Sequence, residues 1–147
     1  MRIACVSSRD PKRRFGDIIR NVDAITSYTT GLSEAQYRAN QLVIDATERC
    51  LLRISEAAVK LGHSAERLAP GMPWADIRGI GNWLRHGYDE INQDAIWEVV
   101  CHQLTPLRAA AAQAISQIEA AAQGTPVVRA RPRRKTKARR KTDPSPS

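Results

Sequence analysis

Apolar residues recur along most of the chain at spacings of three and four, which is the period of an amphipathic α-helix. The first such segment covers residues 13–28, and its apolar stripe consists of Phe15, Ile18, Ile19, Val22 and Ile25. The second covers residues 33–61 and opens with Ser33 and Gln36, a pair that predicts a capping box. Its predicted stripe consists of Leu42, Val43, Ala46, Cys50, Ile54, Ala57 and Leu61.

The last third of the chain continues this pattern. Asn92 or Asp94 is a suitable N-cap for a helix whose apolar residues are Ile96, Trp97, Val99, Val100 and Leu104. Pro106 is predicted to break or kink that helix. With Thr105 as N-cap it also suits the first position of a new helix, which would end near Gly124.

No stretch shows the period-two alternation of a β-strand, and no internal repeat occurs. The pattern predicts an all-α protein, an up-and-down bundle of four or five helices joined by short connections. We expect three regions: a flexible extension over residues 1–12, a helical domain over residues 13–124, and a disordered basic tail over residues 125–147.

The formal charge of +8 belongs to the tail. Residues 125–147 hold nine of the 23 Lys and Arg and one of the 15 Asp and Glu, so residues 1–124 hold 14 of each and are neutral. A wholly basic nucleic-acid-binding domain is therefore not indicated. The tail itself is expected either to bind RNA backbones non-specifically or only to aid solubility. Its cations are Arg129, Arg131, Arg133, Arg134, Lys135, Lys137, Arg139, Arg140 and Lys141.

Cysteine and hydropathy patterns bear on the compartment. Cys5, Cys50 and Cys101 are widely spaced, with neither a C-x-x-C metal pattern nor the even, clustered set of a disulfide framework. That usage favours a reducing compartment. No run of about 18 apolar residues predicts a membrane span, and residues 1–10 lack a signal-peptide core. We therefore expect a cytoplasmic protein with no membrane attachment and no metal site.

The segment from Pro73 to Asn92 carries the candidate chemistry. Its helix is predicted to run from Pro73 to His86 and to end at Gly87, and its apolar face consists of Ile77, Ile80 and Leu84. Asn82, Arg78, Arg85, His86 and Tyr88 are gathered within a few turns, and a core helix does not need such a polar set. The structural alternative for His86 is a role as a cation that stabilises the helix C-terminus.

These residues resemble the signature of the HepT-like toxins, a branch of the all-helical HEPN superfamily. The family motif reads Arg-Asn, three residues, His, one residue, Tyr; Asn82, His86 and Tyr88 match it, and Gly81 replaces the arginine. The resemblance extends over about residues 14–119. Its other marks are DII at 17–19, SYTTG at 27–31, SEAA at 55–58, where the family usually has Gly instead of Ser55, and IW at 96–97.

The resemblance implies an endoribonuclease that needs no metal or cofactor and uses the ribose 2′-hydroxyl to attack the adjacent phosphate. His86 would be the acid/base, because an imidazole is available in both protonation states near neutral pH. Asn82 would hold a phosphate or orient His86. The missing guanidinium would come from Arg78 or Arg85, although both can equally be solvated surface charges. Gly81→Arg would restore the family's Arg-Asn pair and is expected to raise metal-independent cleavage, with helix propensity improved by roughly 0.8–1.0 kcal/mol. The alternative is that Gly81 serves close helix packing, in which case the variant would unfold.

The resemblance also implies partners. Members form homodimers around a shared cleft, for which Trp83 offers an apolar anchor, and they pair with a minimal nucleotidyltransferase antitoxin that silences the toxin by adding AMP to the motif tyrosine, here Tyr88. The alternative function is a catalytically degenerate helical module that keeps only RNA or protein binding.

Overall fold

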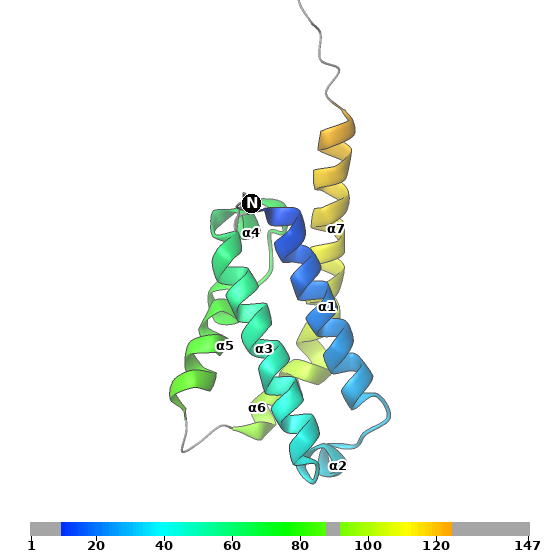
Figure 1. Ribbon diagram of the computed structural model, residues 1–147, viewed down its shortest axis with the longest axis vertical. Coiled ribbons are helices and arrows are strands. Elements are labelled where there is room, and N and C mark those ends of the chain that lie inside the picture. Colours follow the sequence, from blue (N-terminus) through cyan, green and yellow to red (C-terminus); the bar gives the residue numbers. More distant parts are fainter. Residues whose placement is uncertain (1–9, 88–91, 125–147) are drawn as a thin grey trace, which may run out of the picture.

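The computed structural model describes residues 10–87 and 92–124, and every regular element within these ranges is a helix (Figure 1). The expected all-α class is confirmed. The predicted tail, with its nine cations, and Tyr88 lie outside the described residues. The helices are α1 (Pro11–Thr29), α2 (Glu34–Arg38), α3 (Gln41–Leu61), α4 (His63–Leu68), α5 (Trp74–His86), α6 (Gln93–Glu98), the π-helix η1 (Val99–Gln103) and α7 (Leu104–Gln123).

Helix α1 begins two residues before the expected residue 13. The side chain of Asp10 accepts a hydrogen bond from the Lys12 N–H, and Pro11 occupies the first turn, where a missing N–H costs nothing. The predicted stripe is largely confirmed, because Phe15, Ile18, Val22 and Ile25 are buried, while Ile19 is only partly covered.

The single helix predicted over residues 33–61 is wrong, because the chain breaks between α2 and α3. The capping box of Ser33 and Gln36 opens only the short α2. Asn40 then leaves the helical conformation, and its side chain accepts a hydrogen bond from the Val43 N–H as the N-cap of α3. Leu42, placed in the buried stripe by its period, is 79% exposed. The side-chain cap at Asn40 therefore overrides the apolar periodicity.

Of the break or kink predicted at Pro106, the break is wrong, since helical structure runs on from α6 through η1 into α7. The π-helical turn precedes the proline, and the Leu104 N–H donates to the Val99 carbonyl five residues earlier. Pro106 lies in the first turn of α7, which starts at Leu104 without a side-chain cap from Thr105. The wider π-turn thus lets the chain pass the proline without ending the helix. Of the two caps considered for α6, Asn92 is the one used.

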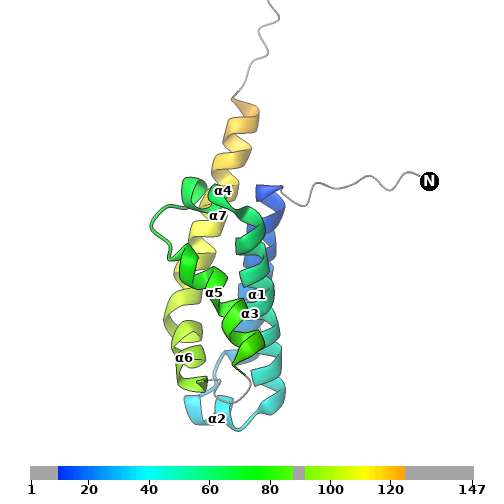
Figure 2. The ribbon, with the colours of Figure 1, turned by 90° about the vertical axis from the view of Figure 1, so that its left-hand side faces the viewer.

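Helix α3 lies at the centre of the packing. It contacts α1 along one side and α5 along the other, and α1 also packs on α7 (Figures 1 and 2). Contacts between α5 and the α6–α7 side are sparse, so α5 depends mainly on α3. The buried core of α3 includes Leu51, Ile54 and Ala58. None of the described helices is long and apolar enough to cross a bilayer.

Candidate active site

The contact that positions α5 joins Ser55 of α3 to two backbone groups of α5. The Ser55 hydroxyl donates to the Arg78 carbonyl oxygen at 2.8 Å and accepts from the Gly81 N–H at 3.1 Å. The Arg78 side chain reaches the Ala58 carbonyl, so residue numbers fall along α3 as they rise along α5. Extending this register places His86 near the level of Arg49 and Cys50.

Gly81 is buried at this contact, and its lack of a side chain is what permits the close approach. A Cβ at Gly81 would lie 2.5 Å from the Ser55 Oγ and 3.0 Å from the Ser55 Cβ, both too short for real contacts. The Ser55 hydroxyl is itself buried and held by its two hydrogen bonds, so it cannot move aside without loss. This geometry therefore favours the alternative that Gly81 serves close helix packing and leaves no room for an arginine.

The end of α5 presents three of the predicted site residues to solvent. Asn82, Arg85 and His86 are all exposed, and the helix stops where the Gly87 N–H donates to the Trp83 carbonyl at 2.8 Å. Within the described residues, no hydrogen bond or ion pair engages the side chains of Asn82 and His86. They are therefore available to a ligand. Tyr88, the fourth motif position, lies outside the described residues.

Arg85 is held only loosely. Its Nη2 lies 3.7 Å from the Glu56 Oε1, and both side chains are 51% exposed. A pair this long and this exposed contributes about 0–1 kcal/mol, because water screens it. Arg85 can therefore exchange Glu56 for a phosphate at small cost.

Arg78 is engaged in the fold. Its guanidinium forms a two-pronged pair with Glu66 at 2.6 and 3.0 Å and donates to the carbonyls of Ala58 and Gly62. The hydrogen bonds with Glu66 raise the pKa of Arg78 and lower the pKa of the Glu66 carboxyl. These partners lie toward the start of α5, whereas His86 lies at its end. The structure thus brings Asn82, Arg85 and His86 together but directs Arg78 away from them.

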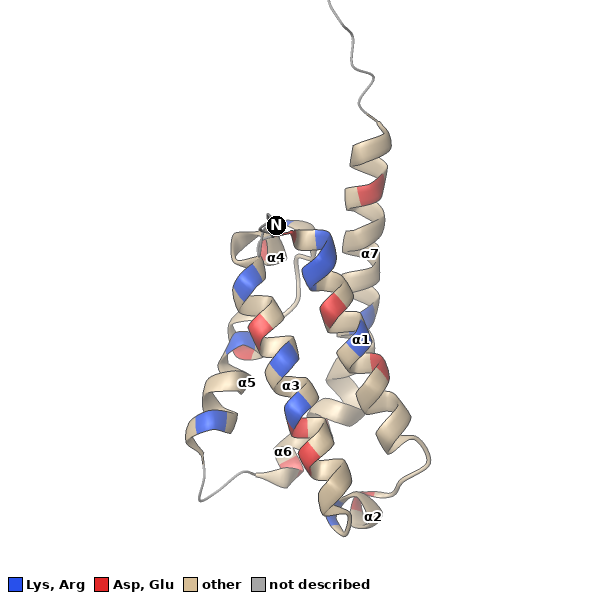
Figure 3. Ribbon diagram, viewed as in Figure 1, with Lys and Arg blue, Asp and Glu red and all other residues tan. Residues whose placement is uncertain are grey.

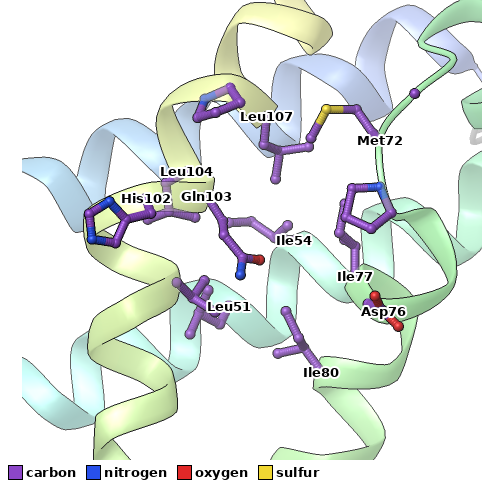
Figure 4. A pocket seen from close by; sticks show the side chains of 14 residues that line it. Leu51, Ile54, Met72, Asp76, Ile77, Ile80, His102, Gln103, Leu104 and Leu107 are labelled. Atoms are coloured by element: carbon purple, nitrogen blue, oxygen red, sulfur yellow. The ribbon is translucent and has the colours of Figure 1, made fainter.

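A cavity lies on a different side of α5. It measures about 320 Å³ and is lined mainly by apolar side chains of α3, α5 and α7, with Asp76 and His102 at exposed positions (Figure 4). A second apolar cavity of about 210 Å³ shares Leu51, Ile80 and Val99 with the first and adds Trp83. Together they form an apolar groove beside α5 that lacks the polar set of the helix end.

Comparison with known proteins assigns this arrangement to a family. The family model described as Ribonuclease HepT-like matches residues 18–114, which include the whole of α5. The chain belongs to the HepT-like ribonuclease family. The resemblance expected from the motif is confirmed, although Gly81 departs from the motif arginine. Among the described residues, the family's Asn and His positions both lie at the exposed end of α5.

Curated relatives of this HepT-like chain occur in Methanocaldococcus jannaschii. The protein named "Putative RNase MJ1216" is 25% identical over 111 residues, covering 76% of this chain and 92% of the relative. "Putative RNase MJ1380" is 26% identical over 95 residues, covering 65% and 87%. "Putative RNase MJ0125" is 24% identical over 111 residues, covering 76% and 96%. No solved structure matches this chain.

Sequence reasoning missed two contacts at this site. The role of Gly81 could not be read from the chain because Ser55, its partner, is 26 residues away. The pairing of Glu56 with Arg85 likewise depends on how α3 and α5 dock. The presence of Ser55 where the family usually has glycine was the one available signal, because a larger residue there calls for a smaller one opposite.

Gly81→Arg is expected to destabilise the protein by about 1–3 kcal/mol, because it overpacks the contact with Ser55. Adding Ser55→Gly removes both clashing atoms and should recover most of this loss. The matched control is Gly79→Arg on the same helix, where a new Cβ meets nothing within 4 Å and a gain of about 0.8–1.0 kcal/mol is expected. Urea unfolding measures all three. Equal stability of Gly81→Arg and Gly79→Arg would contradict the packing role.

Removing the Arg78 side chain should destabilise the protein, whereas removing the Arg85 side chain should not. Arg78→Ala is expected to lower the free energy of unfolding by about 1–3 kcal/mol, because it removes charged hydrogen bonds to the end of α3. Arg85→Ala should change it by less than about 0.5 kcal/mol, since its pair is exposed. Thermal unfolding of both variants checks this, and a larger loss for Arg85→Ala would show that the assignment is reversed.

Proposed function

We propose that this chain is a metal-independent endoribonuclease in which His86 transfers protons at the scissile phosphate. The observation that carries the proposal is the exposed end of α5, where His86, Asn82 and Arg85 stand together without strong partners in the described part of a HepT-like ribonuclease. Membership in a ribonuclease family supports RNA as the substrate.

The proposed reaction needs no group beyond the RNA and the protein. A neutral His86 imidazole takes the proton from the ribose 2′-hydroxyl, and O2′ bonds to phosphorus as the bond from phosphorus to O5′ breaks. The imidazolium form returns a proton to the departing 5′-oxygen, which leaves a 2′,3′-cyclic phosphate and a 5′-hydroxyl. Because attack and departure occur on opposite sides of phosphorus, two imidazoles serve the reaction better than one. A homodimer would supply a His86 from each chain.

Arg85 is the cation we propose for the developing phosphate charge. It is half exposed and loosely paired with Glu56, so it can turn to a phosphate oxygen, and a guanidinium stays charged at every relevant pH. Arg78, the other candidate, would have to abandon Glu66 and two carbonyls. The Asn82 amide, one turn before His86, would donate to the phosphate or orient the imidazole.

The apolar groove beside α5 supports the proposed homodimer. Ile80 and Trp83 are only partly buried in the single chain and line the second apolar cavity. They lie on the same helix as His86, within two turns of it. A second copy seated there would cover this apolar surface and bring the two helix ends into one cleft.

Regulation by an antitoxin is the finer part of the proposal. Tyr88 follows His86 by two residues, so AMP added to its hydroxyl would carry a phosphate charge and bulk into the space that RNA needs. We propose a toxin–antitoxin pair in the cytoplasm, with a minimal nucleotidyltransferase as the modifying partner.

One observation favours a second candidate function. Position 81 holds glycine instead of the motif arginine, and Ser55 leaves no room for a side chain there. A helical module that binds RNA or protein without cutting it therefore fits the same surface. In that case RNA would bind to the exposed end of α5 and remain intact.

His86→Ala is expected to reduce RNA cleavage by at least about 100-fold, the usual contribution of a positioned acid/base. The side chain is exposed, so its removal creates no cavity and the fold should be unchanged. Cleavage of a labelled oligoribonucleotide is measured with EDTA present. His63→Ala, which changes an exposed histidine on α4, is the matched control and should cleave as the wild type does. Undiminished cleavage by His86→Ala would overturn the assignment, and no cleavage by the wild type would favour the binding module.

Light scattering should give a mass of twice the 16.3 kDa chain at micromolar concentration. Trp83→Glu is expected to shift the protein to the monomer, because it places a charge in the apolar groove. Leu42→Glu is the control, since that side chain is already 79% exposed and lies on α3 away from the groove. A monomeric wild type, or a dimer untouched by Trp83→Glu, would contradict the proposed interface.

A further inference from the structure

We infer that the exposed face of α3 binds the phosphodiester backbone of single-stranded RNA and leads it to the end of α5. The inference rests on the proposed function, because it takes the ligand to be the RNA that His86 would cut. It concerns residues outside the motif: Arg49, Arg53 and Lys60.

These three cations have no hydrogen-bonded or ion-paired partner among residues 10–87 and 92–124, and all three side chains are exposed. Most other cations there are paired with carboxylates: Lys12, Arg14, Arg20, Arg38, Arg78, Arg85 and Arg108. Helix α3 as a whole carries three cations and three carboxylates, so the available positive charge belongs to the face of Arg49, Arg53 and Lys60 and not to the whole helix.

The three cations also share one face of α3. Steps of four and seven residues return to the same side of an α-helix, so Arg49, Arg53 and Lys60 point in similar directions. Eleven residues of helix advance roughly 16 Å, which is about five nucleotides of a stacked strand at about 3.4 Å each. Figure 3 shows Lys and Arg positions repeating along the near side of α3, with another near the free end of α5.

The three cations also lie along the part of α3 that leads toward the end of α5. The antiparallel register places His86 near the level of Arg49, and Arg85 reaches across from α5 to Glu56, between Arg53 and Lys60 in the sequence. Glu56 and Asp45 share this face. Glu56 is paired with Arg85, whereas Asp45 accepts a hydrogen bond from the neutral Gln41 amide and keeps its charge. The cations therefore approach the helix end that carries the proposed chemistry.

The surface beside these cations is also hollowed. A polar groove of about 180 Å³ lies between α1 and α3, and its charged lining residues are Arg53, Lys60, Arg14, Asp17 and Glu56. Asp17 is paired with both Arg14 and Arg20, so its carboxylate is neutralised. Glu56, the second carboxylate of the groove, is paired with Arg85 of α5. Arg53 and Lys60 are therefore the cations of this groove that a phosphate group can reach.

The experiment measures binding apart from cleavage. A fluorescent, mixed-sequence 2′-O-methyl oligoribonucleotide cannot be cut by 2′-hydroxyl attack, and its affinity for the full chain is titrated over a range of salt. The variant carries Arg49→Gln, Arg53→Gln and Lys60→Gln. The control carries Arg38→Gln, Arg67→Gln and Arg108→Gln, which remove the same charge from exposed positions on α2, α4 and α7. Thermal unfolding confirms that both triples fold.

We expect the α3 triple to bind at least tenfold more weakly at low salt, with the slope of log affinity against log salt reduced by about 2, since each lost phosphate contact on a single strand removes about 0.7. The control triple should stay within about twofold of the wild type. Equal losses in the two triples would overturn the inference, because general attraction alone would then explain binding. Unchanged binding by the α3 triple would also overturn it.

Cleavage of unmodified RNA in EDTA, run in parallel, separates the two proposals. If the wild type binds through α3 but never cuts, the inference holds and the nuclease assignment fails. If the wild type cuts and the α3 triple binds and cuts equally well, the assignment holds and the inference fails.

Discussion

The hydroxyl of Ser55 lies between two backbone groups of α5, and this contact determines how the candidate site is built. Because Gly81 has no side chain, the two helices approach closely enough for the Gly81 N–H and the Arg78 carbonyl to reach the same oxygen. The contact fixes both the separation and the register of α5. Since α5 has few contacts with the α6–α7 side, much of its position depends on this crossing.

The same contact explains the departure from the family motif. An arginine at position 81 would place its Cβ against Ser55, so the chain cannot hold both residues without moving the helices apart. A serine at 55 and a glycine at 81 therefore form a size-matched pair. The cost is the loss of a guanidinium one residue before Asn82, and the nearest available replacement on the exposed side of α5 is Arg85. Arg78 is not equivalent, because its charge already closes the end of α3 together with Glu66.

Much of this arrangement could be predicted from local patterns. Apolar periodicity identified the helical class, the stripe of α1 and the span of α5, and Gly87 marked its end. It failed where a single polar or imino residue decided the outcome: Asn40 caps α3 inside a periodic stretch, and a π-turn accommodates Pro106. It could not show which charges are paired, because the partners of Arg78 and Arg85 come from other helices. For the same reason the charge count of the folded part did not show that Arg49, Arg53 and Lys60 lack partners among the described residues.

We propose that Arg85 supplies the guanidinium that position 81 lacks, because Ser55 leaves no room for an arginine side chain at that position. The most direct test of this proposal is a rescue experiment, in which cleavage rates are compared for the wild type, for Arg85→Ala, and for Arg85→Ala combined with Ser55→Gly and Gly81→Arg. Arg85→Ala should lose most metal-independent cleavage. Circular dichroism checks that the combined variant folds, and the folded combined variant should regain a large part of the cleavage. A folded combined variant that stays as inactive as Arg85→Ala, or an Arg85→Ala variant with full activity, would contradict the proposal.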